Sequence, residues 1–228
     1  MKVAILQFPG SNCDWDAEHS VKDVMGIPAR RIWHKDVLPS ETEAVIVPGG
    51  FSFGDYLRCG AIARFSPITS DLQQFARQGG QVLGICNGFQ ILCEAGLLPG
   101  ALVRNDCMEF RCFNQNLQIE DSNDRFNQSV LGTTLSLPIA HGEGNYRVDD
   151  STLKELESNK QVLFRYKENP NGSIRDIAGI RNKKGNVYGM MPHPERAVEP
   201  HHPTLHGLPV LKAFLKPILS SSPIDLVK

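Results

Sequence analysis

The chain has 228 residues, of which 41% are hydrophobic and 21% charged, and its formal net charge at pH 7 is −1. This is the composition of an ordinary globular protein and excludes a disordered or fibrous chain. A near-neutral chain without a run of lysine or arginine is not expected to bind nucleic acid or an anionic membrane. No stretch approaches the roughly 18 apolar residues that span a bilayer.

The chain organisation favours one unit. No linker, internal repeat or low-complexity tract interrupts the sequence, so we expect residues 1–228 to form a single domain. Its six cysteines lack the spacing of a zinc ribbon, which is typical of a protein kept in a reducing cytoplasm. We expect five of them to be structural: Cys13, Cys59, Cys93, Cys107 and Cys112.

The first half of the chain predicts an open α/β sheet. Apolar runs followed by turn residues indicate strands at Lys2 to Phe8, Ala29 to His34, Ala44 to Val47 and Val82 to Ile85. Segments with helical spacing or helix-ending glycines indicate helices at Asp14 to Met25, Pro67 to Gln78 and Phe89 to Ala95. This order predicts a mainly parallel sheet flanked by helices.

Beyond Gly100 the pattern changes to short strands and turns. We expect strands at Met108 to Phe113, Leu117 to Ile119, Thr133 to Ile139, Val162 to Tyr166, Ile177 to Arg181 and Val187 to Met191. The segment Asn182 to Asn186 predicts a hairpin turn between the last two. A closing helix at Leu205 to Leu219 is apolar on one side. These segments add short antiparallel strands to the sheet.

One cysteine stands at a junction that favours chemistry. Cys86 follows the apolar run Val82 to Ile85, lies between Gly84 and Gly88, and precedes a helix. Gly-x-Cys-x-Gly between a strand and a helix is the layout of a nucleophile elbow, a strained turn that leaves no room for side chains two residues away. The helix N-terminus there favours a thiolate. The alternative is a small buried cysteine at the end of a core strand.

A glycine-rich loop follows the third predicted strand. The segment Pro48 to Asp55, PGGFSFGD, contains three glycines in a short loop. Ligands of open α/β sheets bind at the carboxyl ends of strands, so this loop and Cys86 should share one edge. A glycine peptide there presents its N–H to a substrate without a side chain in the way, although simple turn formation also explains such a loop.

A nucleophilic cysteine needs a base, and the base needs an orienting group. Two His-x-Glu pairs are available: His141 with Glu143, and His193 with Glu195. Residues two apart in an extended segment point the same way, so each glutamate could fix the tautomer of its own histidine. Spacing does not choose between the pairs. Prolines on both sides of His193 lock its backbone, which is one advantage of the second pair.

Other polar residues give weaker indications. Three histidines near the carboxyl end, His201, His202 and His206, are interrupted by a proline, which is poor geometry for a metal-ligand set. We therefore predict no metal site. Asp55 and Arg58 in the glycine loop could contact a ligand or merely cap and solvate the loop.

With these motifs in hand, the chain resembles the class I (triad) glutamine amidotransferases, which have a flavodoxin-like α/β fold. Within them it is similar to the family of glutaminase subunits of phosphoribosylformylglycinamidine synthase, which acts in purine synthesis. The similarity runs over nearly the whole chain except Asp150 to Gly172. Four segments carry it: Pro48 to Ala63, Gly84 to Pro99, His141 to Tyr146 and Met191 to Ala197.

The resemblance implies a catalytic triad. Cys86 would attack the side-chain amide of glutamine and form a γ-glutamyl thioester. His193 would protonate the departing ammonia and then activate the water that hydrolyses the thioester, while Glu195 holds the imidazole. The resemblance thus selects His193 over His141 as the base.

The resemblance also implies an oxyanion hole and a glutamine-binding site made of Gly50, Phe51, Asn87 and Gln90. Backbone N–H groups of Asn87 and Gly50 would hold the oxyanion. Gln90, one turn into the helix, matches a position that helps to seat glutamine.

The expected partner is a second polypeptide. The sequence contains no Gly-x-x-x-x-Gly-Lys-Ser/Thr loop for ATP. We therefore expect no cofactor in this chain, with ATP and magnesium used by a synthetase subunit that receives the ammonia. The resemblance also implies a small accessory subunit.

Three alternatives stay open from the sequence. A stand-alone γ-glutamyl-type cysteine hydrolase would use the same elbow without a partner. A non-catalytic binding module would keep the fold without the chemistry. A glutaminase subunit of another synthetase would differ in its acceptor.

Overall fold

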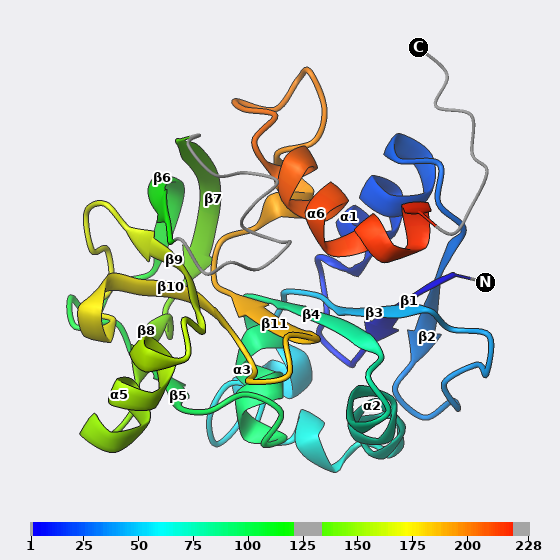
Figure 1. Cartoon of the computed structure of the whole chain (residues 1–228), viewed down its shortest axis with the longest axis horizontal. Coiled ribbons are helices and arrows are strands. Elements are labelled where there is room, and N and C mark those ends of the chain that lie inside the picture. The colour runs from blue at the N-terminus through cyan, green and yellow to red at the C-terminus, as the bar shows by residue number, and fades with distance from the viewer. Residues whose placement is uncertain (1, 121–133, 221–228) are drawn as a thin grey trace.

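The computed structural model describes residues 2–120 and 134–220. A nine-stranded sheet runs through the molecule in the order β2-β1-β3-β4-β11-β10-β9-β6-β7. Helices cover both of its faces in the half that contains β1 to β4 (Figure 1). The fold class predicted from the sequence is therefore confirmed.

The first five strands in this order are parallel. Four of them are almost wholly buried, as expected for a sheet that is covered on both faces, and only the edge strand β2 alternates between buried and exposed residues. Their bounds are β1 (Val3–Gln7), β2 (Ala29–Trp33), β3 (Ala44–Val47), β4 (Gln81–Ile85) and β11 (Val187–Met190).

Two layers of helices enclose the parallel strands. Helices α1 (Asp14–His19) and α6 (Gly207–Ser220) lie on one face, and α2 (Pro67–Arg77) and α3 (Asn87–Glu94) lie on the other (Figure 1). In α6 the predicted apolar side is buried, with Leu211, Phe214 and Leu215 at most 1% exposed. Burial of these apolar faces holds the helices to the sheet.

The rest of the sheet is antiparallel. It contains β10 (Ile177–Arg181), β9 (Val162–Tyr166), β6 (Arg111–Ile119) and β7 (Leu135–His141). A separate two-stranded sheet pairs β5 (Ala101–Val103) with β8 (Asn145–Arg147). The hairpin predicted at residues 182–186 joins β10 to β11, as expected.

Several predicted elements need correction. The two strands expected at residues 108–113 and 117–119 form one strand, β6, because its pairing with β7 continues from Arg111 to Leu117. The first helix changes to a π-helical turn at Ser20–Val24, η1. The prediction missed strands β5 and β8 and helix α5 (Asp150–Ser158), whose N-cap Asp149 accepts a hydrogen bond from the Thr152 N–H. Thr133, the predicted start of β7, lies outside the described residues.

Four short 3₁₀ turns complete the described secondary structure: η2 (Ser52–Asp55), η3 (Ala63–Phe65), η4 (Ile174–Asp176) and η5 (Pro194–Arg196). Within the described residues, every helix is too short or too polar to cross a lipid bilayer.

Candidate active site

The predicted site residues follow three neighbouring parallel strands and therefore lie at one edge of the sheet. Strand β4 pairs with β3 on one side and β11 on the other, with Val47 opposite Gly84 and Met190 opposite Ile85. The glycine loop begins just after β3, Cys86 follows β4, and His193 lies three residues beyond the end of β11. The parallel register therefore brings together segments that lie far apart in the sequence.

The turn at Cys86 has the geometry of a nucleophile elbow. Cys86 has a φ of 50°, in a region that non-glycine residues rarely adopt. A Cβ added to Gly88 would lie 1.8 Å from the carbonyl oxygen of Val47, and one added to Gly84 would lie 2.7 Å from the Gly88 backbone. Both glycines are therefore required by backbone packing, as the sequence motif predicts.

The Cys86 side chain is held between two strands and a helix. Its backbone N–H donates to the carbonyl of Met190 at 2.8 Å, which ties the elbow to the end of β11. Its Sγ lies 3.6 Å from the carbonyl oxygen of Ala140, at the end of β7. The first turn of α3 begins directly after it. Cys86 is 5% exposed, so its sulfur reaches solvent only through a narrow opening.

His193 and Glu195 form a buried pair beside this elbow. The Nδ1 of His193 lies 2.6 Å from Oε1 of Glu195. The η5 turn, which begins directly after His193, places the two side chains next to each other. Burial by itself would lower the pKa of His193, but the charges of Glu195 and Cys86 outweigh it and raise the pKa well above 6.5. The imidazole is thereby stabilised in its charged form.

The Nε2 of His193 has no hydrogen-bond partner within the described part of the chain. The Cys86 side chain lies close enough to this imidazole to raise its pKa. Nucleophile–base contacts are often long in an unliganded site and tighten when substrate binds. The arrangement can therefore supply a base on one side of the sulfur and an orienting carboxylate behind the base.

A cavity of about 230 Å³ opens above these groups. Its walls include both sulfur-bearing and aromatic side chains: Cys13, Phe51, Cys86, Phe110, Cys112 and His193. A larger cavity of about 760 Å³ lies between α5 and β9 and is lined mainly by charged residues such as Lys154 and Arg165. Cys86 and His193 both line the smaller cavity and neither lines the larger one.

The glycine loop is fixed by backbone hydrogen bonds to the segment after β1. The Phe51 N–H donates to the carbonyl of Gly10 at 3.0 Å, and the Cys13 N–H donates to the carbonyl of Gly49 at 3.3 Å. A Cβ on Gly49 would lie 2.7 Å from Cε1 of His193. Glycine is therefore needed here for the close approach of the imidazole, a reason that the sequence does not reveal.

Comparison with known proteins fits this geometry. A family model for CobB/CobQ-like glutamine amidotransferase domains matches residues 1–207. The chain belongs to this family. A chain in the structure of PurLQS from Thermotoga maritima is 40% identical to this amidotransferase, with a TM-score of 0.86, over 95% of this chain and 98% of that one. The predicted membership of the glutamine amidotransferases is confirmed.

Two more distant structures share the fold of the amidotransferase. A putative subunit of a GMP synthase from Thermoplasma acidophilum is 13% identical with a TM-score of 0.60, over 96% of this chain and 95% of that one. A glutamine amidotransferase from Thermotoga maritima is 14% identical with a TM-score of 0.58, over 99% of this chain and 86% of that one. At these identities the likeness concerns architecture alone.

The predicted glutamine-binding residues lie around Cys86 in different ways. The buried Gln90 amide donates to the carbonyl of Glu143 at 2.7 Å and accepts from Nδ2 of Asn87 at 2.9 Å. The Oδ1 of Asn87 in turn accepts from the N–H of Ser52 in the glycine loop, at 3.2 Å. Gln90 and Asn87 thus connect helix α3 to the glycine loop and to the segment that follows β7. Only the Phe51 side chain is substantially exposed, at 45%.

His141 differs from His193 in its partner and its protonation. Glu143 does not orient His141: the Oε2 of Glu143 accepts from the Cys59 N–H at 3.4 Å, whereas Nδ1 of His141 lies 3.3 Å from Oδ1 of Asn105. Burial, assisted by the nearby charge of His193, lowers the pKa of His141 to about 4. The amidotransferase thus holds one neutral and one charged imidazole at the same edge of the sheet.

Two residues near the site were missed by the sequence reasoning. Cys13, expected to be purely structural, lies beside the His193 imidazole and raises its pKa. Burial raises the pKa of the Cys13 thiol itself. Asn105 contacts His141 from a segment that no motif marks. Only its position before a predicted strand was visible in the sequence, so nothing there could have identified it.

The remaining polar residues singled out in the sequence do not line the cavity that contains Cys86. The Arg58 guanidinium forms two hydrogen bonds with the Glu94 carboxylate, at 2.6 and 2.9 Å. Asp55 is half-buried, and burial raises its pKa. The Nδ1 atoms of His202 and His206 each accept a backbone N–H, from residues 198 and 136 respectively.

Proposed function

We propose that this amidotransferase is the glutaminase subunit of phosphoribosylformylglycinamidine synthase. The observation that supports the choice of acceptor is its 40% identity to a chain of PurLQS over almost the full length of both chains. The observation that supports the chemistry is the buried His193–Glu195 pair beside Cys86 at the ends of adjacent strands.

In the first step, the sulfur of Cys86 attacks the side-chain amide carbon of glutamine. The C–S bond forms first and places a negative charge on the amide oxygen. The C–N bond then breaks as the imidazolium of His193 gives its proton to the nitrogen, which departs as ammonia. Glu195 holds the imidazole through Nδ1 and stabilises its positive charge, so the opposite nitrogen faces the reacting atoms.

The negative charge on the amide oxygen needs donors in place before reaction. We assign this role to the backbone N–H groups of Asn87, in the first turn of α3, and Gly50. Losing one such donor typically raises the barrier by about 3 kcal/mol. The N–H of Phe51 is already bonded to Gly10, so Phe51 contributes its ring to the cavity wall.

In the second step, water hydrolyses the thioester. Neutral His193 takes a proton from the water, whose oxygen attacks the thioester carbon, and the C–S bond breaks to release Cys86 as a thiolate. This restores the charged imidazole beside the thiolate, and the new carboxyl group loses its proton to solvent as glutamate departs.

The ammonia must reach its acceptor without being protonated by water, because ammonium is not a nucleophile. We assign the acceptor chemistry, with its ATP and magnesium, to a docked synthetase subunit, together with a small accessory subunit. The exposed Phe51 and Phe110 rings stack at the rim of the cavity, with centroids 6.4 Å apart. Exposed apolar rings at the mouth of a site favour a protein partner over open solvent.

The test is reconstitution with the synthetase subunit. With glutamine, ATP and magnesium, the complex should form phosphoribosylformylglycinamidine, and Cys86→Ser should abolish this while leaving synthesis from added ammonia intact. If the subunit supports glutamine-dependent synthesis only with a different synthetase and its acceptor, the assignment to phosphoribosylformylglycinamidine synthase would be wrong. Full glutaminase activity without any partner would favour a stand-alone hydrolase.

A further inference from the structure

A fully buried asparagine, Asn105, makes several hydrogen bonds to the turn that follows β7. Asn105 lies just beyond β5, and its backbone N–H donates to the carbonyl of Gly142 at 2.9 Å. Its side-chain Nδ2 donates to the carbonyl of His141 at 2.9 Å, and its Oδ1 accepts the N–H of Gly144 at 2.9 Å. One residue thus fixes three positions of the turn at residues 141–144.

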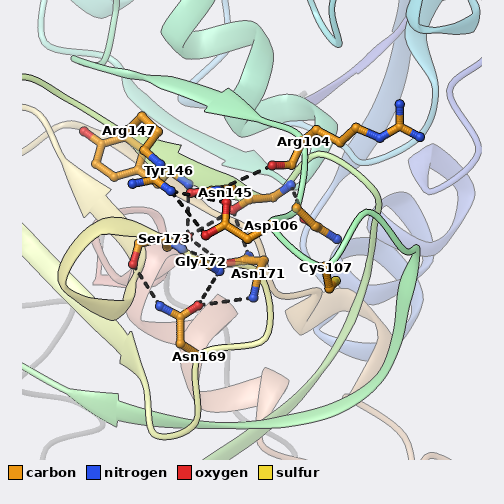
Figure 2. Close-up of polar contacts among 12 residues, drawn as sticks. Arg104, Asp106, Cys107, Asn145, Tyr146, Arg147, Asn169, Asn171, Gly172 and Ser173 are labelled. Carbon is orange, nitrogen blue, oxygen red and sulfur yellow. Dashed lines mark hydrogen bonds and ion pairs between the residues drawn. The ribbon is translucent and has the colours of Figure 1, made fainter.

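A second segment, residues 171–173, also holds this turn. The Nδ2 of Asn171 and the hydroxyl of Ser173 both donate to the carbonyl of Gly144, at 2.8 and 3.1 Å. The Asp106 N–H donates to the carbonyl of Asn171, which ties this segment to the one that carries Asn105. Figure 2 shows Asp106, Asn145, Asn171 and Ser173 joined in one polar network.

The same turn and the residue before it also contact the residues around Cys86. The carbonyl of Glu143 accepts from Gln90, which is bonded through Asn87 to the glycine loop. The carbonyl of Ala140, just before the turn, is the one that contacts Sγ of Cys86. A shift of the turn would therefore move the support of Gln90 and a contact of the nucleophile together.

The contacts of Asn105 also determine which nitrogen of His141 carries its proton. The Nδ2 group faces two carbonyls, those of His141 and Glu109, and the Oδ1 faces the N–H of Gly144, so the orientation of the amide is fixed. The Nδ1 of His141 therefore faces an oxygen and must donate to it. His141 is held as the neutral Nδ1–H tautomer.

We propose that Asn105 is a positioning residue for glutamine binding, which acts by fixing the turn at residues 141–144 and the tautomer of His141. The proposal rests on the proposed function, since the turn matters only if Gln90 and Cys86 serve glutamine. Asn105 does not touch the cavity, so its influence passes through the turn.

The alternative is that Asn105 is an ordinary buried asparagine that contributes only to stability. The chain offers a matched control in Asn186, which is 3% exposed and donates through Nδ2 to the carbonyls of Ala76 and Gly80, both at 2.8 Å. Asn186 precedes β11 and lies at the opposite end of that strand from His193. Asn186→Ala should remove similar hydrogen bonds without changing the position of the residues around Cys86.

The experiment compares wild type, Asn105→Ala and Asn186→Ala in complex with the synthetase subunit. The probe is a glutamine analogue with a diazoketone in place of the amide, and the rate of adduct formation on Cys86 is measured against its concentration. For Asn105→Ala we expect the half-saturating concentration to rise about tenfold or more, since a misplacement of about 1 Å can cost up to a hundredfold. The limiting rate should change less than this, and Asn186→Ala should stay within about twofold of wild type in both values.

Nitrogen NMR of the histidine rings tests the tautomer assignment directly. Wild type and Asn186→Ala should show His141 as the Nδ1–H tautomer, and Asn105→Ala should lose that signature. If Asn105→Ala does not fold, Asn105→Asp takes its place, because it keeps an oxygen facing His141 and Gly144 but loses both bonds to carbonyls. It should weaken binding of the analogue while retaining the tautomer.

Equal half-saturating concentrations for Asn105→Ala and Asn186→Ala would overturn the proposal, as would an unchanged His141 tautomer in Asn105→Ala. Failure of the proposed function gives a different result, because then even the wild-type complex would form no adduct. That outcome would overturn both.

Discussion

The imidazole of His193 and the carboxylate of Glu195 lie 2.6 Å apart and are almost completely shielded from solvent. Charged groups buried to this degree are stable only when they are paired. His193 is the N-cap of the η5 turn and Glu195 lies within it, so this turn, and not an extended segment, aligns the two side chains. The charge of Glu195 thus helps to keep the buried His193 imidazole protonated.

Replacing Glu195 by glutamine should lower glutaminase kcat/KM by about a hundredfold or more. The substituted glutamine side chain keeps the shape of Glu195 but removes the charge that stabilises the imidazolium. Correctly placed acid–base groups typically increase the reaction rate by about 10²- to 10⁴-fold. Steady-state assays of the complex measure the effect. Glu199→Gln is the control, because Glu199 lies beyond η5, is partly exposed and pairs with His19. An equal loss in both variants would contradict the role of Glu195.

The two histidines should differ sharply in kinetic importance. His193→Ala removes the proposed base and should reduce turnover by about 10²- to 10⁴-fold. His141→Ala should leave most of the turnover number intact, because His141 faces Asn105 and its pKa of about 4 keeps it neutral at pH 7. Turnover measured at saturating glutamine decides the ranking, and the reverse order would transfer the role of base to His141.

His141 should also make stability depend on pH. Its pKa is about 4 in the folded protein and 6.5 ordinarily, so between these values the unfolded chain binds more protons. The free energy of unfolding should therefore fall as pH decreases from about 7 to 4, with His141 contributing up to about 3 kcal/mol of the loss. Below about pH 4 its contribution is fully lost.

Urea unfolding at a series of pH values tests this prediction. His193, whose pKa is raised, acts in the opposite direction: its contribution is present at low pH and is lost as pH rises through its folded pKa. Comparing wild type with His141→Gln isolates the His141 contribution. A pH slope between 4 and 6.5 that is identical in both proteins would contradict the assignment.

The sequence predicts the strands and helices better than it predicts the residues that hold the candidate site in place. The parallel strands end within one or two residues of their predicted bounds because buried apolar runs and turn residues mark them clearly. The elbow was predictable because Gly-x-Cys-x-Gly encodes a local steric demand. By contrast, helix α5 has a polar composition with only Leu156 buried, so little apolar periodicity marks it.

Contacts between distant segments explain the rest. Asn105 and His141 are 36 residues apart and meet through an asparagine amide that no spacing rule reveals. The approach of Gly49 to His193 joins the loops that follow strands β3 and β11, which lie far apart in the chain. Such pairings depend on strand order, which hydrophobic periodicity does not determine.

The elbow glycines should tolerate no side chain. In Gly88→Ala the new Cβ would meet the Val47 carbonyl at 1.8 Å, so we expect a loss of about 3 kcal/mol or more in unfolding free energy. Gly96→Ala is the control: its φ of 69° is strained for alanine, but no atom lies within 4 Å of the added Cβ. It should cost only about 1 kcal/mol. Thermal or urea unfolding compares the two, and equal losses would argue against steric packing as the reason for Gly88.

The most direct test of the central claim is the intact mass of the wild-type chain and of Cys86→Ser after exposure to the diazoketone analogue of glutamine, with the synthetase subunit present. A single adduct on wild type and none on Cys86→Ser would establish a nucleophile that recognises glutamine at the end of β4. Absence of an adduct on wild type, or an adduct that persists in Cys86→Ser, would contradict the assignment of Cys86.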